Sequence, residues 1–175
     1  PLRATSLTGD WQVATWKRWP LASRRDSTWT GSGIVSVKPN QYLGDQLEEA
    51  GVPFQSPVGG HAVFIDAGRM LPHLAWKQYP GHALANQLYL DAGIRSCDIG
   101  SYLMDRDPVT HEEQQAPFEF TRLAVPRRVY TQSHMDVIAE AVIKIAREPE
   151  TVPGYRITWE PPVLRHFTSR LEPIR

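Results

Sequence analysis

The sequence predicts one domain of mixed α and β structure, of the α/β or α+β layered type. The first reason is length, because 175 residues suffice for one ordinary domain. The second is composition: 41% hydrophobic and 22% charged residues lie near the averages of globular proteins. The third is the pattern after residue 40, where short helix-like and strand-like segments alternate without internal repeats.

The first predicted segments follow residue 41. Leucines four residues apart predict a helix over residues 42–50, and Gly51 is its stop signal. The run HAVFID predicts a short buried strand over residues 61–66, after a Gly-Gly pair. Asp66 is expected to cap a helix over residues 68–74.

Pro80 suits the first turn of a helix that runs over residues 80–92, and Gly93 is expected to end it. Residues 94–103 resemble a strand with a turn. Residues 105–117 are polar and predict a loop.

A strand is predicted over residues 118–125. Which of its two sides faces the core stays open, because each alternating set of side chains mixes polar and apolar residues. Ser133 is expected to cap a long helix that ends before Pro149. Residues 156–159 and 163–171 are candidate strands. The core side of the long helix is predicted to carry Met135, Ile138, Val142 and Ile145.

Charge and cysteine content exclude several classes of protein. Lys+Arg and Asp+Glu are both 19, which argues against a dedicated nucleic-acid or membrane-surface binder. No apolar run approaches the ~18 residues of a membrane helix. The single Cys97 excludes an intramolecular disulfide framework, and the six His residues lack ligand spacing, so no metal site is expected. The chain begins without Met or a signal-peptide pattern, as a piece of a longer cytoplasmic protein would.

Generic catalytic motifs are missing from the sequence. Gly31-Ser-Gly33 lacks the rest of a nucleotide-binding fingerprint, and there is no Gly-x-Ser-x-Gly elbow. Cys97 is favoured as a strand core thiol over a nucleophile. Arg122 and the pair Arg127-Arg128 stand out on and after an otherwise apolar strand. Arg122 has two explanations: a structural ion pair with a nearby acid, or a clamp for a carboxylate ligand.

Four strings of the sequence resemble a known family. They are GGHAVFIDAGRMLPHL, LYLDAGIRSCDIGSYLMDRDP, TRLAVPRRVYTQSHMD and WEPPVLRHFTSRL. They look like the C-terminal part of the tryptophanases (tryptophan indole-lyases), which belong with the tyrosine phenol-lyases to the β-eliminating lyases. The resemblance covers about residues 42–175 without gaps. It implies a C-terminal small domain, residues 41–175, of the aspartate-aminotransferase-like (fold type I) enzymes.

The resemblance assigns roles to three residues. Arg122 falls where the family's arginine binds the α-carboxylate of the amino-acid substrate. Ile99 falls where phenol-lyases carry an arginine that recognises the phenol ring. His166 falls where phenol-lyases have phenylalanine and tryptophanases have histidine. The resemblance therefore implies cleavage of L-tryptophan to indole, pyruvate and ammonia, with a phenol-lyase-like enzyme as the alternative.

The resemblance also implies pyridoxal 5'-phosphate, potassium, a homotetramer and a cytoplasmic enzyme, with no nucleic-acid or membrane partner. The family's Schiff-base lysine falls before residue 1, and neither Lys17 nor Lys38 matches its context. No catalytic, cofactor-binding or metal-binding residue is therefore expected in this chain, which is expected to be inactive alone. An inert fragment or pseudogene product is the second hypothesis. Nucleic-acid binding by the basic N-terminal segment is the third.

Residues 1–40 differ from the rest of the chain. They carry six Lys/Arg and two Asp/Glu, and four of the six Trp lie within the first 29 residues. Read with a shift of two bases, their codons permit a sequence that resembles the family segment preceding YLGDQL. Because Trp has a single codon, it forces the shifted residue at each Trp position, and every forced residue agrees. We therefore expect residues 1 to about 39 to be a frameshifted translation that forms no domain.

Overall fold

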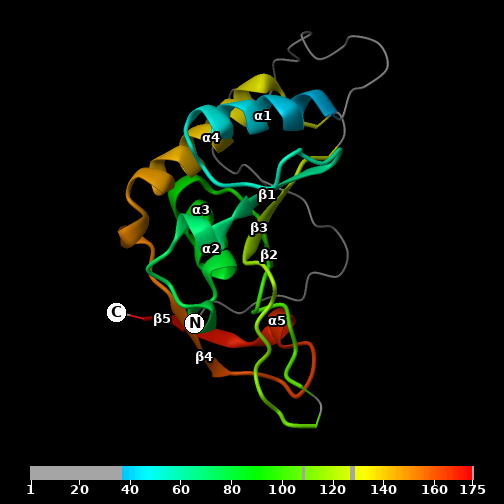
Figure 1. Cartoon of the computed structure of the whole chain (residues 1–175), viewed down its shortest axis with the longest axis vertical. Coiled ribbons are helices and arrows are strands. Elements are labelled where there is room, and N and C mark those ends of the chain that lie inside the picture. The colour runs from blue at the N-terminus through cyan, green and yellow to red at the C-terminus, as the bar shows by residue number, and fades with distance from the viewer. Residues whose placement is uncertain (1–36, 108, 127–128, 175) are drawn as a thin grey trace.

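The computed structural model describes residues 37–107, 109–126 and 129–174. The expectations for residues 1–36 and for Arg127-Arg128 lie outside these residues. The part of the chain that is described forms a small α+β structure with a three-stranded sheet and a two-stranded hairpin (Figure 1). Its elements are α1 (Val37–Glu49), β1 (Ala62–Asp66), α2 (Ala67–Met70), η2 (Trp76–Gln78), α3 (Pro80–Ala92), β2 (Cys97–Ile99), β3 (Phe120–Ala124), α4 (Gln132–Arg147), η3 (Pro149–Thr151), β4 (Tyr155–Trp159), α5 (Arg165–Thr168) and β5 (Arg170–Pro173).

Helix α3 is the element that the sequence predicted best, with both ends confirmed. Pro80 stands at its first turn, where the missing amide hydrogen costs no intrahelical bond. Gly93 ends it in the left-handed conformation, with φ +67°, which glycine adopts without strain. Asp66 is confirmed as a cap, because its Oδ1 accepts a hydrogen bond from the Arg69 amide at 3.0 Å. The helix that it caps ends at Met70, earlier than expected.

Two further expected boundaries are wrong. Helix α1 begins at Val37 instead of residue 42, and its Asn40 is fully buried and donates to the Gly59 carbonyl at 2.8 Å. The N-cap of α4 is Thr131, and Ser133 lies inside the helix. The Thr131 amide donates to Nδ1 of His134 at 3.0 Å. A histidine therefore takes the position where a capping box ordinarily has Glu or Gln.

The strand expected over residues 163–171 is also wrong. Leu164 adopts a left-handed φ of 54°, and the next residues form the single turn α5. Only the end of the predicted range continues into strand β5, which pairs antiparallel with β4. The tertiary contacts of Arg165, described below, account for this turn.

The three-stranded sheet has the order β1-β3-β2, with both pairs antiparallel. One face packs against the helices: Val63, Ile65 and Leu123 are fully buried in one cluster with α1, α3 and α4. Thr121 shares this face and donates from Oγ1 to the Gly81 carbonyl of α3 at 2.8 Å. The four predicted core residues of α4 are confirmed as buried. Thr121 and Leu123 of β3 therefore point toward the helices, and Arg122 lies on the sheet face that the helices do not cover.

The hairpin of β4 and β5 lies at the lower end of the molecule with α5, while α1 and α4 pack together at the top (Figure 1). The expected α+β character is confirmed for the described part of the chain. The assignment to the aspartate-aminotransferase fold stays a prediction.

Candidate substrate-binding face

The open sheet face is the side of the three-stranded sheet that the helices do not cover. It carries Phe64, Cys97, Ile99, Phe120 and Arg122. The register places Arg122 opposite Phe64 of β1 and Cys97 of β2, and it places Ile99 opposite Phe120. Because side chains alternate along a strand, the antiparallel pairing puts all five side chains on one face. Each of them is partly exposed.

Aromatic rings make this face apolar around the arginine. The rings of Phe64 and Phe120 meet edge to face at 6.2 Å between centroids, and Phe118 stacks on Phe120 at 5.2 Å. Phe118 is 61% exposed. Among the described residues, this face therefore combines aromatic side chains with the guanidinium of Arg122, which suits a ligand that has both a carboxylate and an aromatic part.

Arg122 has no ion-pair partner among the residues that the structure describes. The structural ion pair that was one explanation of this arginine is therefore not seen in that part of the chain. A partly buried guanidinium without a carboxylate partner is ready to accept an anion, and its fork matches a carboxylate by two parallel hydrogen bonds.

Cys97 lies beside Arg122 and is free. Burial, together with the nearby Asp98, raises the pKa of its thiol, and Arg122 offsets this only in part. A raised pKa keeps the thiol protonated and unreactive, as expected of a structural cysteine. Its place on the partly exposed face, outside the core, differs from the expectation.

His166 lies on the single turn α5. Its ring contacts Phe167 at 4.1 Å between centroids, and its Nδ1 is buried without a hydrogen-bond partner among the described residues. Burial lowers the pKa of His166, and the charge of Asp105 opposes this shift. The imidazole is therefore neutral at pH 7, with one ring nitrogen a donor and the other an acceptor according to tautomer.

The structure brings the three predicted site residues into one region without joining them directly. Ile99 and Arg122 share the open sheet face. His166 lies beside the turn that follows β2, since the Tyr102 hydroxyl approaches the His166 carbonyl at 3.5 Å. Within the described residues, no hydrogen bond or ion pair connects these three side chains with one another.

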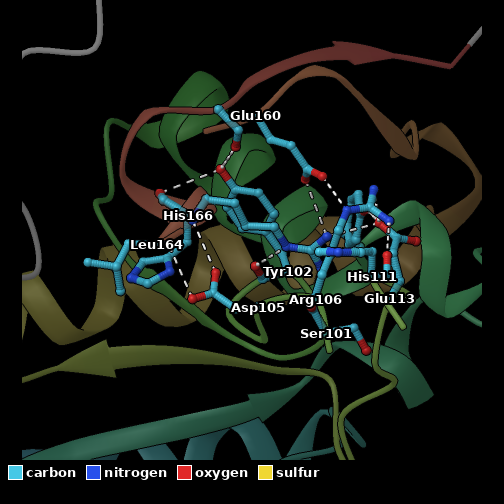
Figure 2. A network of polar contacts seen from close by, with 12 residues as sticks. Ser101, Tyr102, Asp105, Arg106, His111, Glu113, Glu160, Leu164 and His166 are labelled. Atoms are coloured by element: carbon cyan, nitrogen blue, oxygen red, sulfur yellow. Dashed lines mark hydrogen bonds and ion pairs between the residues drawn. The ribbon is translucent and has the colours of Figure 1, made fainter. Parts of the chain in front are cut away.

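The sequence analysis missed a polar cluster centred on Arg165, the residue before His166. The Arg165 cluster consists of Ser101, Tyr102, Arg106, Glu113, Glu160 and Arg165 (Figure 2). The Arg165 side chain is only 2% exposed, and its Nη1 lies 2.9 Å from Oε1 of Glu113. The available signal was an arginine within a segment that otherwise reads as a strand, but its carboxylate partner lies 52 residues away in the sequence.

A buried pair of acids was also missed. Asp98 points from β2 toward the helices, and burial with the nearby charge of Glu119 raises the pKa of Asp98 to about 8. Burial likewise raises the pKa of Glu119, although its Oε1 accepts a hydrogen bond from the Ser101 amide at 3.0 Å. A Cβ on Gly81 would lie 2.1 Å from Oδ1 of Asp98, so only glycine fits there. Asp98 is therefore a neutral acid packed behind Ile99.

Two further observations bear on cofactors and membranes. Across the described residues, no group of three or more His, Cys, Asp and Glu side chains could hold a metal ion. In the same residues, no helix has the length and apolar character needed to cross a membrane.

Comparison with known proteins identifies the family. The model of the family described as beta-eliminating lyase matches residues 36–141, which is more than half of the chain. The chain belongs to the beta-eliminating lyase family. It is 50% identical over 146 residues to a tryptophanase of Haemophilus influenzae, which covers 83% of this chain and 30% of that protein. It is 49% identical over 134 residues to a tyrosine phenol-lyase of Symbiobacterium thermophilum, covering 77% of this chain and 29% of that protein.

The resemblance to this family is thus confirmed, and two consequences follow. The chain spans about 30% of the length of the curated relatives it matches. Relatives named for two different substrates are equally similar, so identity alone does not choose between tryptophan and tyrosine. The match begins near the point where the frameshift hypothesis returns to frame, and that hypothesis stays a prediction.

Proposed function

We propose that this chain forms the substrate-facing, C-terminal part of a lyase that cleaves L-tryptophan to indole, pyruvate and ammonia. The observation that carries the proposal is Arg122, a guanidinium without a carboxylate partner among the described residues, on the same sheet face as Ile99. In this proposal residues 41–175 are the small domain of the family, and residues 1–40 lie outside it.

Arg122 holds the α-carboxylate of the amino acid. Its fork makes two parallel hydrogen bonds to a carboxylate, which orients the ligand as well as binding it. The neighbouring strands hold the backbone of Arg122 on both sides, because β3 is the central strand. Binding energy at the carboxylate is thereby converted into orientation of the bond that must break.

Ile99 and His166 select the ring of the substrate. An aliphatic side chain at residue 99 offers no charge to a phenol oxygen but packs against the larger, apolar indole. A neutral imidazole at residue 166 can form a hydrogen bond with the indole N–H. A tyrosine phenol-lyase-like activity is the second candidate, favoured by the relative that bears that name at 49% identity.

The two lysines whose side chains the structure describes do not fit the Schiff-base role toward pyridoxal phosphate. Lys77 is exposed and lies over the Trp76 ring, and the exposed Lys144 pairs with Asp91 at 3.3 Å. Neither lies in the buried setting that depresses a lysine pKa for imine chemistry. We therefore propose that the lysine that binds the cofactor is neither of these two and that the chain alone is inactive; the potassium ion and the homotetramer stay predictions from the family resemblance.

The proposal is tested by joining residues 37–175 to the N-terminal portion of the Haemophilus influenzae tryptophanase. We expect faster release of indole from tryptophan than of phenol from tyrosine. Arg122→Gln should lower kcat/KM for tryptophan about 100-fold, because a charge-assisted pair and its orientation are lost. Arg156→Gln, which removes an exposed arginine on β4, is the matched control and should have little effect.

The proposed roles of Ile99 and His166 in recognising the substrate ring are tested by a separate double variant. Ile99→Arg together with His166→Phe should lower the activity on tryptophan. Faster release of phenol than indole by the unmodified joined enzyme would support the second candidate. An unchanged kcat/KM for tryptophan in the double variant would remove Ile99 and His166 from the site.

A further inference from the structure

Helix α5 is a single turn and cannot be stable by itself. Its four residues are far fewer than the ~12 that an isolated helix needs in water. It also begins after Leu164 in a left-handed conformation, with φ 54°. The position of His166 therefore depends on contacts that other parts of the chain make with this turn.

Two of these contacts come from the loop after β2. The carboxylate of Asp105 accepts hydrogen bonds from the amides of Leu164 and Arg165, at 3.1 and 3.2 Å. The Tyr102 hydroxyl lies 2.6 Å from the Ser169 hydroxyl, at the far end of the turn. These bonds hold α5 at both ends, through backbone amides at its start and through the Ser169 side chain at its end.

The side chain of Arg165 makes the third and most buried contact. Its Nη2 donates to the Ser101 carbonyl at 2.9 Å, and its Nε donates to the Tyr102 carbonyl at 3.3 Å (Figure 2). Those carbonyls belong to the second and third residues after Ile99. One guanidinium thus connects the turn that carries His166 to the strand that carries Ile99.

A carboxylate keeps this guanidinium charged and in place. Burial alone would raise the pKa of Glu113, but hydrogen bonds from Tyr79 and Arg165 outweigh it and hold the pKa below its ordinary value. Glu160 adds a second carboxylate, with its Oε2 at 3.5 Å from Nη1 of Arg165 and its Oε1 bonded to Arg106. Each of the three guanidinium nitrogens therefore has a partner, which fixes the orientation of the fork.

We propose that Arg165 is a positioning residue for recognition of the substrate ring, because its bonds to the Ser101 and Tyr102 carbonyls set His166 at a defined place relative to Ile99. This inference rests on the proposed function, in which those two side chains face the ring. A lysine cannot replace the arginine, since one ammonium lacks the planar fork that reaches two carbonyls and Glu113 together.

The first test uses the 175-residue chain labelled with ¹⁵N-histidine, and follows the titration of His166 by NMR. His166→Phe identifies the signal by removing it. We expect Arg165→Lys to raise the pKa of His166 toward the ordinary value of about 6.5, because the turn loosens and the ring gains water. The matched control Arg156→Lys should leave the titration unchanged.

The amide signals of α3 show in the same samples whether each variant is folded. A folded Arg165→Lys chain with the wild-type His166 titration would overturn the proposal, because the charge alone would then suffice. If the Lys variant is unfolded, Glu113→Gln carries the test: it weakens the hold on the Arg165 guanidinium, leaves the charge of Asp105 in place, and should shift the pKa of His166 in the same direction. An unshifted His166 in that folded variant would also overturn the proposal.

The second test uses the joined enzyme and two substrates. β-Chloro-L-alanine has the same α-amino and α-carboxylate groups as tryptophan but no ring. Arg165→Lys should lower kcat/KM for tryptophan about tenfold and leave that for β-chloro-L-alanine within about twofold, because only ring placement changes. Equal losses on both substrates would indicate a merely structural role and overturn the inference. An unchanged ratio in His166→Phe would instead contradict the proposed function.

Discussion

The open sheet face and the Arg165 cluster each contain an arginine, and the two arginines differ in exposure and in partners. On the open face, Arg122 is partly exposed and lacks an ion-pair partner in the described part of the chain. In the cluster, Arg165 is 2% exposed, and its donors bond to one carboxylate and two carbonyls. The two arginines thus differ in burial and in partners together, and Arg165 joins segments that lie far apart in the sequence.

The largest effect expected from this comparison is on stability. Arg165→Met should lower the free energy of unfolding by about 3–5 kcal/mol, since it leaves buried carboxylates without their cation. Arg122→Met should change it by no more than about 0.5 kcal/mol, because no described ion pair is lost. Urea unfolding of the two variants measures both values. Equal losses would show that the two regions do not differ in this way.

The second effect is a pH dependence of the unfolding free energy, caused by Asp98 on the buried side of the sheet. The pKa of Asp98 is about 8 in the folded chain, against about 3.9 when unfolded. The folded state therefore binds the additional proton, and its stability falls as pH rises through this window. Burial lowers the pKa of His82 to about 4, against about 6.5 when unfolded. Between these two pH values the unfolded state binds the additional proton, so His82 makes the stability rise with pH there. Of these two groups, Asp98 is the one whose protonation still differs between the folded and unfolded states over most of the range from pH 6.5 to 8.

We therefore expect unfolding free energy to decrease by roughly 1 kcal/mol per pH unit over pH 6.5–8. Asp98→Asn should flatten this slope, because an amide does not titrate. Urea titrations at several pH values supply the measurement. A slope that persists in Asp98→Asn would assign the pH dependence to another group.

The smallest effect belongs to an exposed ion pair. Arg156 and Glu172 pair across the β4–β5 hairpin at 3.2 Å, and both side chains are more than half exposed. A double-mutant cycle with Arg156→Met and Glu172→Gln should give a coupling of less than about 0.5 kcal/mol. A coupling above 2 kcal/mol would mean that exposure does not weaken arginine pairs in this domain, against the contrast with Arg165.

Local signals predicted those elements whose ends are set by local chemistry. Pro80 and Gly93 act through their own backbone preferences, so both ends of α3 could be predicted. The cap of α4 was misplaced because its partner residue is His134, which is not part of the usual capping pattern. The turn α5 could not be predicted, because residues distant in the sequence hold it in place.

Some features of the candidate site could likewise be predicted from the sequence, and others could not. The residue types at positions 99, 122 and 166 and their family resemblance were visible in the sequence. The lack of a described carboxylate beside Arg122, and the burial of Nδ1 in His166, depend on neighbours from several elements. Neither property follows from residue spacing.

The sequence by itself determined the order of the main helices and strands, the ends of α3 and the membership of the beta-eliminating lyase family, because these depend on local preferences and on runs of matching residues. Only the tertiary structure decided which face of β3 is covered. A strand alternates with a period of two, so the sequence offers two sets of side chains of which packing on α3 selects one. That selection buries Leu123 and leaves Arg122 on the open sheet face.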